Sequence, residues 1–488
     1  MTIEEEMAII NHQSSITNHP HIPLATYRLQ FGPALRFQDA RALIPYLSEL
    51  GISDLYASPI LKATPGSTHG YDATDPDELN PELGTWEDFQ ALAAEVWVHG
   101  MGWLQDIVPN HMAYAGTNRM LMDVFENGPR SRFYDFFDIF HDHPDPELRT
   151  RVLAPFLGSP LEEVLQRGEM QLVLDENGLA FQYFTWRFPL SLATYDEILG
   201  HGDPMSGSQG GDDPALQAFA ELRESFACLS GLGDSSKKRE QVAHAKRTLV
   251  QLHREHPMIR LYLDGILESY NRVAGVPPAR VEGGPPSNRG PETLGTRGRD
   301  ARDTGPLYRL LEQQVFKPVF WQKAYEEINY RRFFYLSEFI ALRTEDPRVF
   351  QRVHRKTLEL VRAGIFTGLR VDHVDGLYNP RQYLVRLHRE APEAYLAVEK
   401  ILELYEFLRT DWPIQGTSGY KFCNYVNGVF CRRENEQAFT DTYHTFIGAA
   451  PDYSQLLYDE KKILEWRMAG EVDYLAHLAE QASRELDI

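Results

Sequence analysis

The sequence predicts an α/β fold with a parallel sheet, because short apolar segments typical of strands alternate with longer amphipathic segments typical of helices. Each strand–helix unit is long enough to cross over and return parallel to the strand before it. No GxGxxG motif follows the first strand, which weakens the dinucleotide-binding version of such a fold. At this point the pattern is consistent with both a barrel and a doubly wound sheet. The first units are the strand "LATYRLQF" with the helix "FQDARALIPYLSELG", the strand "SDLYASPI" with the helix "TWEDFQALAAEVWVHG", and the strand "GWLQDIV".

The middle of the chain interrupts this alternation. Residues 113–305 hold a β-like patch, "MQLVLDENGLAFQYFTW", and a charged helical stretch from about 214 to 274. Residues 275–305 contain many Gly, Pro and Arg and almost no large apolar residue, so we expect a mobile loop there. The alternation then returns with the helix "RVFQRVHRKTLELVRAG", the strand "GLRVD", the helix "PRQYLVRLHREA", the strand "AYLAVEKI" and a candidate sixth strand in "WPIQGTSGYKF", followed by helices.

These patterns divide the chain into five segments. They are an N-terminal extension at 1–23, the first part of the sheet domain at 24–112, an inserted subdomain at 113–305, the continuation of the sheet domain at 306–433 and a helical segment at 434–488. A chain of 488 residues exceeds what one hydrophobic core usually serves, so more than one structural unit is expected.

The composition excludes several classes of protein. The formal net charge is −21, from 49 basic and 70 acidic residues, which argues against nucleic acid or an anionic membrane as the main partner. The three cysteines form neither a disulfide framework nor a pair with zinc-ligand spacing. The acidic, polar start differs from a signal peptide, and no apolar run approaches the roughly 20 residues of a membrane span. We therefore expect a soluble, cytoplasmic protein; nothing in the pattern indicates an oligomeric state.

Polar side chains gather where the predicted strands end. Asp106 and His111 follow the third strand, Asp372 ends the fourth, and Glu399 ends the fifth, 399 − 372 = 27 residues later. Neighbouring parallel strands lie about 4.8 Å apart, so side chains at equivalent ends face each other. A retaining glycosidase uses two carboxylates about 5–5.5 Å apart, and without substrate we expect the carboxyl carbons to lie roughly 5–7 Å apart. We expect Arg370 to point to the same face as Asp372, where its charge can keep that carboxylate ionised.

Each of these assignments has a structural alternative. An aspartate at a strand end is usually a helix cap or an ion-pair partner, and a lone histidine is usually a hydrogen-bonded structural residue. Glu403 and Glu406 are equal candidates for the acid if "VEK" is an ordinary surface charge pair, but the strand "AYLAV" directly before Glu399 favours Glu399. For the tryptophans Trp103, Trp186, Trp321 and Trp412, core packing is favoured over stacking on sugars.

Six motifs occur in a fixed order: "HGYDATDPDELNPELGT", "DIVPNHM", "EINYRRFF", "GLRVDHVDGLYNP", "VEKIL" and "DWPIQGTSGYKFCNYVNGVF". With the long insertion they resemble the maltooligosyltrehalose synthases of the α-amylase-type glycoside hydrolase family 13, from about Leu24 onward. The resemblance implies a (β/α)8 TIM barrel with a mostly helical insertion after strand 3. It also implies an isomerase, a (1→4)-α-D-glucan 1-α-D-glucosylmutase of trehalose biosynthesis. Such an enzyme converts the reducing-end α-1,4 link of a maltooligosaccharide into an α,α-1,1 link, without a metal or organic cofactor.

The resemblance implies roles for residues in direct contact with the substrate. Asp372 lies at the position of the nucleophile and Glu399 at that of the general acid/base. Arg370 matches the arginine that supports the nucleophile. His111 matches the histidine that contacts the sugar at the cleaved bond, and Tyr71 matches the tyrosine that stacks on this sugar.

Further residues around the site are implied by the same motifs. Asp72, Asp106 and Asn110 match positions that mainly hold the site's loops. His373 and Asp375 lie where the synthase pattern "DHxDGL" departs from ordinary amylases, which assigns them to the acceptor side.

The chain departs from the family pattern at several points. Lys421 in "GTSGYKF" stands where the family has an acid, and "EKILELYEF" lacks the glycines of the usual loop. The fourth signature region, which holds a third catalytic aspartate, has no match, and at most six strands are counted. We therefore expect the N-terminal part of a synthase, poorly soluble and nearly inactive as residues 1–488 alone. The remaining candidates for the third carboxylate are Asp441, Asp452, Asp459, Asp473 and Asp487.

Two other functions stay open. In the same fold, the chain is an α-glucan hydrolase or transglycosylase if water or another sugar accepts the glycosyl group. If the absent third carboxylate removes catalysis, the chain is a carbohydrate-binding fragment.

Overall fold

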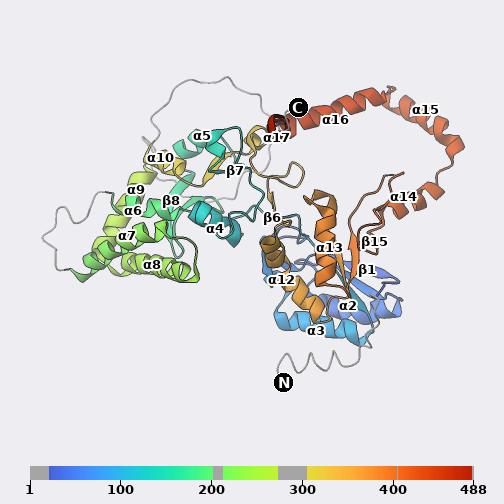
Figure 1. Ribbon diagram of the computed structural model, residues 1–488, viewed down its shortest axis with the longest axis horizontal. Coiled ribbons are helices and arrows are strands. Elements are labelled where there is room, and N and C mark those ends of the chain that lie inside the picture. The colour runs from blue at the N-terminus through green and yellow to red at the C-terminus, as the bar shows by residue number, and fades with distance from the viewer. Residues whose placement is uncertain (1–20, 202–212, 273–304, 404, 486–488) are drawn as a thin grey trace. The chain divides into compact units, whose positions relative to one another are not determined.

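The computed structural model describes residues 21–201, 213–272, 305–403 and 405–485, which fall into two compact units (Figure 1). The first unit, within residues 1–114 and 332–464, is built on a parallel six-stranded half-barrel sheet with the strand order β1-β2-β5-β13-β14-β15. All six strands coincide with predicted strands, so the predicted α/β fold with a parallel sheet is confirmed. These strands are β1 (Thr26–Leu29), β2 (Asp54–Ala57), β5 (Gly102–Ile107), β13 (Gly368–Val371), β14 (Tyr395–Val398) and β15 (Gly416–Thr417).

The two faces of this sheet differ because side chains alternate along each strand. Apolar residues such as Leu55, Leu369 and Leu396 point to one face and are buried in the main hydrophobic cluster of the unit. Asp106 and Arg370 are register partners on the neighbouring strands β5 and β13, so their side chains point to the same, opposite face. The sheet therefore has one apolar face and one face that carries buried polar groups.

Four helices cover the apolar face (Figure 1). Each is amphipathic and contributes several side chains to the same cluster as the strands. A ring chain from Phe37 through Phe89 to Trp103 joins two of the helices to the sheet, with centroid distances of 5.6 and 5.5 Å. The four helices are α2 (Phe37–Glu49), α3 (Trp86–Val98), α12 (Pro347–Arg362) and α13 (Pro380–Glu390).

Two short strand pairs extend the loops that leave the sheet. The strand β3 (Leu61–Ala63) pairs antiparallel with β4 (Ala73–Leu79), and β6 (His111–Ala113) pairs antiparallel with β12 (Phe339–Ala341). The second pair connects the segment after β5 to the segment before α12.

The second unit lies within residues 115–331 and 465–488. It contains an antiparallel sheet, β10-β9-β8, that matches the predicted β-like patch, and a parallel pair, β11-β7. Its helices α7, α8 and α9 match the predicted charged helical stretch. Its strands are β7 (Val152–Leu157), β8 (Met170–Asp175), β9 (Gly178–Tyr183), β10 (Trp186–Pro189) and β11 (Phe316–Phe320). Its helices are α4 (Arg119–Asn127), α5 (Leu161–Gln166), α6 (Tyr195–Leu199), α7 (Pro214–Gly231), α8 (Ser236–Glu255), α9 (Pro257–Asn271), α10 (Pro306–Glu312), α11 (Ala324–Glu327) and α17 (Ala469–Glu485).

The observed units differ from the predicted segments at two places. Residues 306–331, which we assigned to the sheet domain, belong to the inserted unit because β11 pairs with β7. The helix α17 also belongs to this unit, where the ring of Tyr474 stacks on Phe140 at 4.0 Å and its hydroxyl donates to Asp142 at 2.6 Å. Residues 275–304 of the predicted mobile loop lie outside the described residues.

Between β15 and α17 lie the helices α14 (Tyr420–Val429), α15 (Glu436–Ile447) and α16 (Tyr453–Arg467), of which α15 and α16 fall in the segment predicted to be helical. None of the three contains a buried side chain. Among the residues that the structure describes, every helix is too short or too polar to cross a lipid bilayer.

Candidate active site

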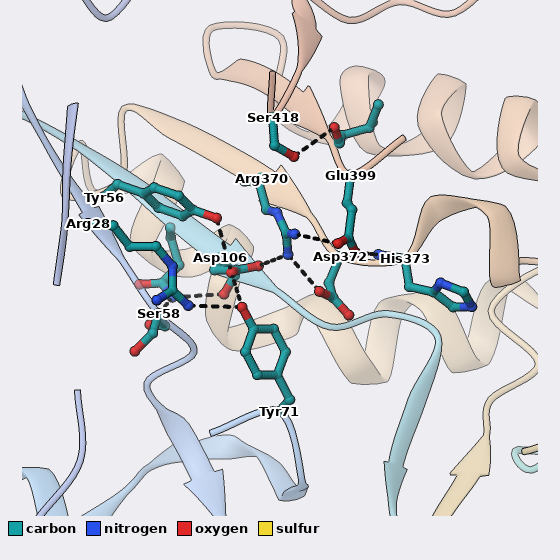
Figure 2. Close-up of polar contacts among 12 residues, drawn as sticks. Arg28, Tyr56, Ser58, Tyr71, Asp106, Arg370, Asp372, His373, Glu399 and Ser418 are labelled. Atoms are coloured by element: carbon teal, nitrogen blue, oxygen red, sulfur yellow. Dashed lines mark hydrogen bonds and ion pairs between the residues drawn. The ribbon is translucent and has the colours of Figure 1, made fainter. Parts of the chain in front are cut away.

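Three neighbouring strands of the sheet end at one cluster of ionisable side chains (Figure 2). Asp106 lies on β5, Arg370 on β13, Asp372 directly after β13, and Glu399 directly after β14. The parallel pairing continues past the strand ends, because the amide of Asp372 donates to the carbonyl of Ile107 at 2.9 Å. The sheet thus brings Asp106, Asp372 and Glu399, which the sequence analysis placed at strand ends, to one cluster with Arg370.

The guanidinium of Arg370 connects the three carboxylates. Its Nη1 lies 2.7 Å from Oδ1 of Asp106 and 2.6 Å from Oδ1 of Asp372. Its Nη2 lies 3.3 Å from Oε1 of Glu399. Asp372 and Glu399 therefore contact the two terminal nitrogens of one planar guanidinium, and the pairing of their strands brings them there.

One cation beside three carboxylates leaves an excess of negative charge in a buried site. Burial raises the pKa of Asp372 to about 7, against the opposing effect of Arg370. Burial also raises the pKa of Asp106, whose side chain is fully buried. Burial acts to raise the pKa of Glu399 too, but the amide of His373, Arg370 and the hydroxyl of Tyr420 together lower it below its usual value. In the free site a proton therefore resides on Asp372 more readily than on Glu399.

Glu399 is held by groups from two further segments. The backbone N–H of His373 donates to its Oε2 at 2.9 Å, and the hydroxyl of Tyr420 donates to its Oε1 at 3.0 Å. His373 adopts the left-handed conformation, with φ of 45°, which turns its amide toward Glu399 (Figure 2). This conformation is uncommon for a residue with a side chain and is often found at functional sites.

Known proteins resemble this chain over most of its length. Residues 41–155 match the family model described as the catalytic domain of α-amylase. A putative maltooligosyl trehalose synthase of Mycobacterium tuberculosis strain H37Rv is 27% identical over 441 residues, which are 89% of this chain and 41% of that protein. A solved structure of a glycosyltrehalose synthase is 30% identical with a TM-score of 0.64, over 93% of this chain and 48% of the other. The chain is a maltooligosyltrehalose synthase-like member of the α-amylase family.

The match to this family is partial in length. The solved maltooligosyltrehalose synthase from Arthrobacter ramosus is 26% identical with a TM-score of 0.64, over 93% of this chain and 45% of that one. This chain therefore spans less than half the length of the relatives that it matches.

Tyr71, which the family resemblance assigns to sugar stacking, holds Asp106 in this structure. Its hydroxyl donates to Oδ2 of Asp106 at 2.7 Å and accepts from Arg28 at 3.0 Å. The hydroxyl of Tyr56 reaches the same carboxylate oxygen at 3.3 Å, and burial raises the pKa of Tyr56 to about 12. The sequence analysis did not single out Arg28 and Tyr56. The sequence feature that could have identified them is a charged and a phenolic side chain in the middle of two neighbouring strands, at positions that pair in register.

His111 and its neighbours lie deeper than the family resemblance suggested. The ring of His111 packs against Phe333 and Phe339 at centroid distances of 5.0 and 4.7 Å, and the residue is only 2% exposed. Asn110 lies beside it, with its amide nitrogen 3.3 Å from Nδ1 of His111. Contact of His111 with a sugar therefore stays a prediction that requires a change around these rings.

Asp72 and Asp375 form contacts at the edges of the site. Asp72 accepts hydrogen bonds from Ser67, at 2.5 Å, and from Thr64, contacts that fit the structural role implied for it. Asp375 forms an exposed ion pair with Lys400 at 3.1 Å. Lys400 in turn contacts Glu406 at 2.9 Å.

The segment after β14 contains Lys421, where the sequence analysis noted a departure from the family motif. Lys421 donates to the carbonyl oxygen of Glu406 at 2.7 Å and lies over the ring of Phe407. Glu406, an early alternative to Glu399, therefore stabilises this loop and lies outside the Arg370 cluster.

The candidates for a third carboxylate have local contacts where the structure describes them. Asp441 and Asp459 each accept from a glutamine four residues earlier on the same helix, and Asp452 accepts from the amide of Ser454 where α16 begins. Asp473 lies on α17 in the second unit, and Asp487 lies outside the described residues.

Proposed function

We propose that this chain holds the nucleophile and the acid/base of a maltooligosyltrehalose synthase, with Asp372 and Glu399 in these roles. The observation that carries the proposal is the contact of both carboxylates with the two ends of the Arg370 guanidinium. The similarity to relatives with this name supports the choice of reaction within the family. A maltooligosaccharide is the proposed substrate.

In the first step, Glu399 donates its proton to the oxygen of the reducing-end glycosidic bond. A carboxylate oxygen of Asp372 forms a bond to C1 of the neighbouring sugar as the C1–O bond breaks. This step requires the proton on Glu399, whereas the free site favours it on Asp372. The glycosidic oxygen of a bound substrate accepts from protonated Glu399, and the positive charge that develops at C1 in the transition state stabilises ionised Asp372, so both favour the proton on Glu399 during the reaction.

In the second step, the released glucose attacks the same C1 with its anomeric hydroxyl. Glu399 takes the proton of this hydroxyl, and the bond between Asp372 and C1 breaks. Two inversions at C1 retain its configuration and give the α,α-1,1 link. Exclusion of water from the intermediate separates this isomerisation from hydrolysis.

The first prediction concerns the products formed from maltopentaose by the protein expressed from its complete gene. We expect the reducing ends to disappear while the number of glucose units stays constant, measured by a reducing-sugar assay and mass spectrometry. Shorter sugars instead would identify an α-glucan hydrolase, and binding without any conversion would identify a carbohydrate-binding protein; both results contradict the proposal.

Two substitutions assign the roles. Asp372→Asn removes the nucleophile and is expected to lower the turnover of maltopentaose and of α-maltosyl fluoride by about a thousandfold or more. Glu399→Gln is expected to lower turnover of maltopentaose to a similar extent but to keep a burst of fluoride release, because fluoride leaves without a proton. Glu390→Gln, an exposed residue that pairs with Arg362 on the outer helices, is the matched control and keeps full turnover.

A further inference from the structure

The two oxygens of Glu399 have different surroundings. Oε1 accepts from the hydroxyl of Tyr420 at 3.0 Å and lies 3.3 Å from Nη2 of Arg370. Within the described part of the chain, Oε2 has a single donor, the amide of His373 at 2.9 Å. Oε1 is thus held by a hydrogen bond and an ion pair, whereas Oε2, with one donor, keeps a lone pair for a further partner.

Tyr420 is fixed relative to Glu399 by the backbone. The amide and the hydroxyl of Ser418 both donate to the carbonyl of Val398, at 2.9 and 3.1 Å, and Val398 directly precedes Glu399 (Figure 2). Gly419 then adopts a left-handed conformation, with φ of 91°, that turns the chain into α14, where Tyr420 is the first residue. The strand pair β14-β15 and this turn therefore present the hydroxyl of Tyr420 to Glu399.

We propose that Tyr420 is the positioning residue of the acid/base: together with Arg370 it anchors Oε1 of Glu399, so that Oε2 carries the transferred proton. This inference rests on the proposed role of Glu399. It adds a residue from the segment after β14, in which the sequence analysis placed a motif and a candidate strand but no residue of the site.

Loss of the Tyr420 hydroxyl has two consequences. The carboxylate of Glu399 loses one of the contacts that fix its orientation, so proton delivery to the leaving oxygen becomes less efficient. The ionised form of Glu399 also loses a donor, so the pKa of Glu399 rises. Because the acid acts in its protonated form, the alkaline limb of the activity profile moves to higher pH.

Other charged groups also affect this limb. Arg370 on β13 and Asp372 and His373 directly after it lie beside Glu399. Asp106 on β5 acts on Glu399 through its ion pair with Arg370. Asp372 titrates together with Glu399, so the apparent pKa of the alkaline limb describes both carboxylates and cannot be assigned to Glu399 alone. A comparison between two variants that keep all of these groups isolates the contribution of Tyr420.

The experiment compares Tyr420→Phe with wild type on two substrates. We expect kcat/KM for maltopentaose to fall about tenfold, and the alkaline limb to move up by about half a pH unit, as for the loss of one hydrogen bond to a charged group. With α-maltosyl fluoride, whose leaving group needs no proton, kcat/KM is expected to stay within about twofold of wild type. Tyr425→Phe makes the same chemical change on α14 at an exposed ring away from Glu399, and it is expected to leave both substrates unaffected.

The outcomes separate this inference from the proposed function. Equal losses on both substrates without a shift of the limb would show that Tyr420 only stabilises the fold and would overturn the inference. Unchanged turnover of maltopentaose in Tyr420→Phe would overturn it as well. Failure of wild type to form the non-reducing product would instead contradict the proposed function. If shorter sugars form in its place, the comparison of the two substrates still tests Tyr420.

Discussion

Asp372, the proposed nucleophile, illustrates how a buried carboxylate lowers the stability of the fold that holds it. Its side chain is 10% exposed and shares one guanidinium with Asp106 and Glu399. An ionised group with so little solvent and only a share of one cation is less stable than in the unfolded chain, which explains its raised pKa. The same residue that the proposed reaction needs in its ionised form therefore opposes folding when it is ionised.

Asp372→Asn is accordingly expected to stabilise the protein at pH 8, by on the order of 1–3 kcal/mol. The folded pKa of about 7 lies above the unfolded value of 3.8, so between these values the folded state binds a proton that the unfolded state has lost. The contribution of Asp372 to the stability of wild type therefore falls as the pH rises from about 4 to about 7, whereas the asparagine does not titrate. The gain should be small near pH 4 and constant above pH 7.

Urea denaturation of both proteins at several pH values measures this difference, with Glu390→Gln as the control for loss of an exposed carboxylate. A gain that does not depend on pH, or that shrinks as the pH rises, would contradict the raised pKa.

At the residue scale, the sequence was sufficient to predict which side chains cluster where ionisable residues lie at or near the end of a predicted strand. Asp372 and Glu399 directly follow apolar strands and Arg370 lies on one, and strand pairing brings the three together. Tyr420 was not found, because its contact depends on the left-handed turn at Gly419, which no periodicity indicates. His111 was assigned from a motif, but its burial depends on Phe333 and Phe339 from a distant segment.

At the element scale, the turn after β13 is the structure that orients the site. A Cβ atom on Gly376 would overlap the ring of His373 and lie 2.8 Å from Oδ1 of Asn110. Only glycine lets this turn close while the amide of His373 still donates to Glu399. The motif "DHVDGL" is thus constrained by packing as well as by chemistry.

Gly376→Ala is expected to destabilise the first unit by about 1–3 kcal/mol, because a methyl group has to displace the imidazole in a packed site. If the backbone of the turn shifts with the ring, the amide of His373 moves away from Glu399, so turnover should fall as well. Gly416→Ala is a matched control, since a Cβ atom at this β15 position meets no atom within 4 Å. Denaturation and turnover of both variants test this expectation, and equal effects of the two would contradict it.

Prediction of the elements succeeded where local pattern decides the structure. The six strands and the helices between them follow from alternation and amphipathicity, which act within a few residues. The boundary at 305 was assigned differently because β11 pairs with β7, a partner far away in the sequence that no local pattern identifies. The capping box at Thr85 and Asp88, by contrast, marks the start of α3 within four residues.

At the scale of the whole molecule, the helices after β15 contrast with the sheet that precedes them. The sheet and its helices bury a continuous cluster of apolar side chains, whereas α14, α15 and α16 bury none. Large rings on α14 and α15 are strongly exposed, including Phe422 at 72% and Phe446 at 89%. Short helices gain most of their stability from packing an apolar face against other elements. These helices instead expose their apolar side chains to solvent.

We expect purified residues 1–488 to self-associate at about 10–100 μM, because exposed aromatic faces of this size associate non-specifically in water. Replacing Phe422, Phe430, Phe439 and Phe446 by serine should reduce the association, since these four rings are 72–89% exposed and contribute no core packing. The matched control replaces Asn427, Gln437, Thr442 and Gln455, polar residues on α14, α15 and α16, by serine and should associate like wild type. Size-exclusion chromatography with light scattering measures the mass of each protein over this concentration range. A monomeric wild type throughout the range would show that the rings are covered by other parts of the chain, and association that persists in the four-phenylalanine variant would assign it to another surface.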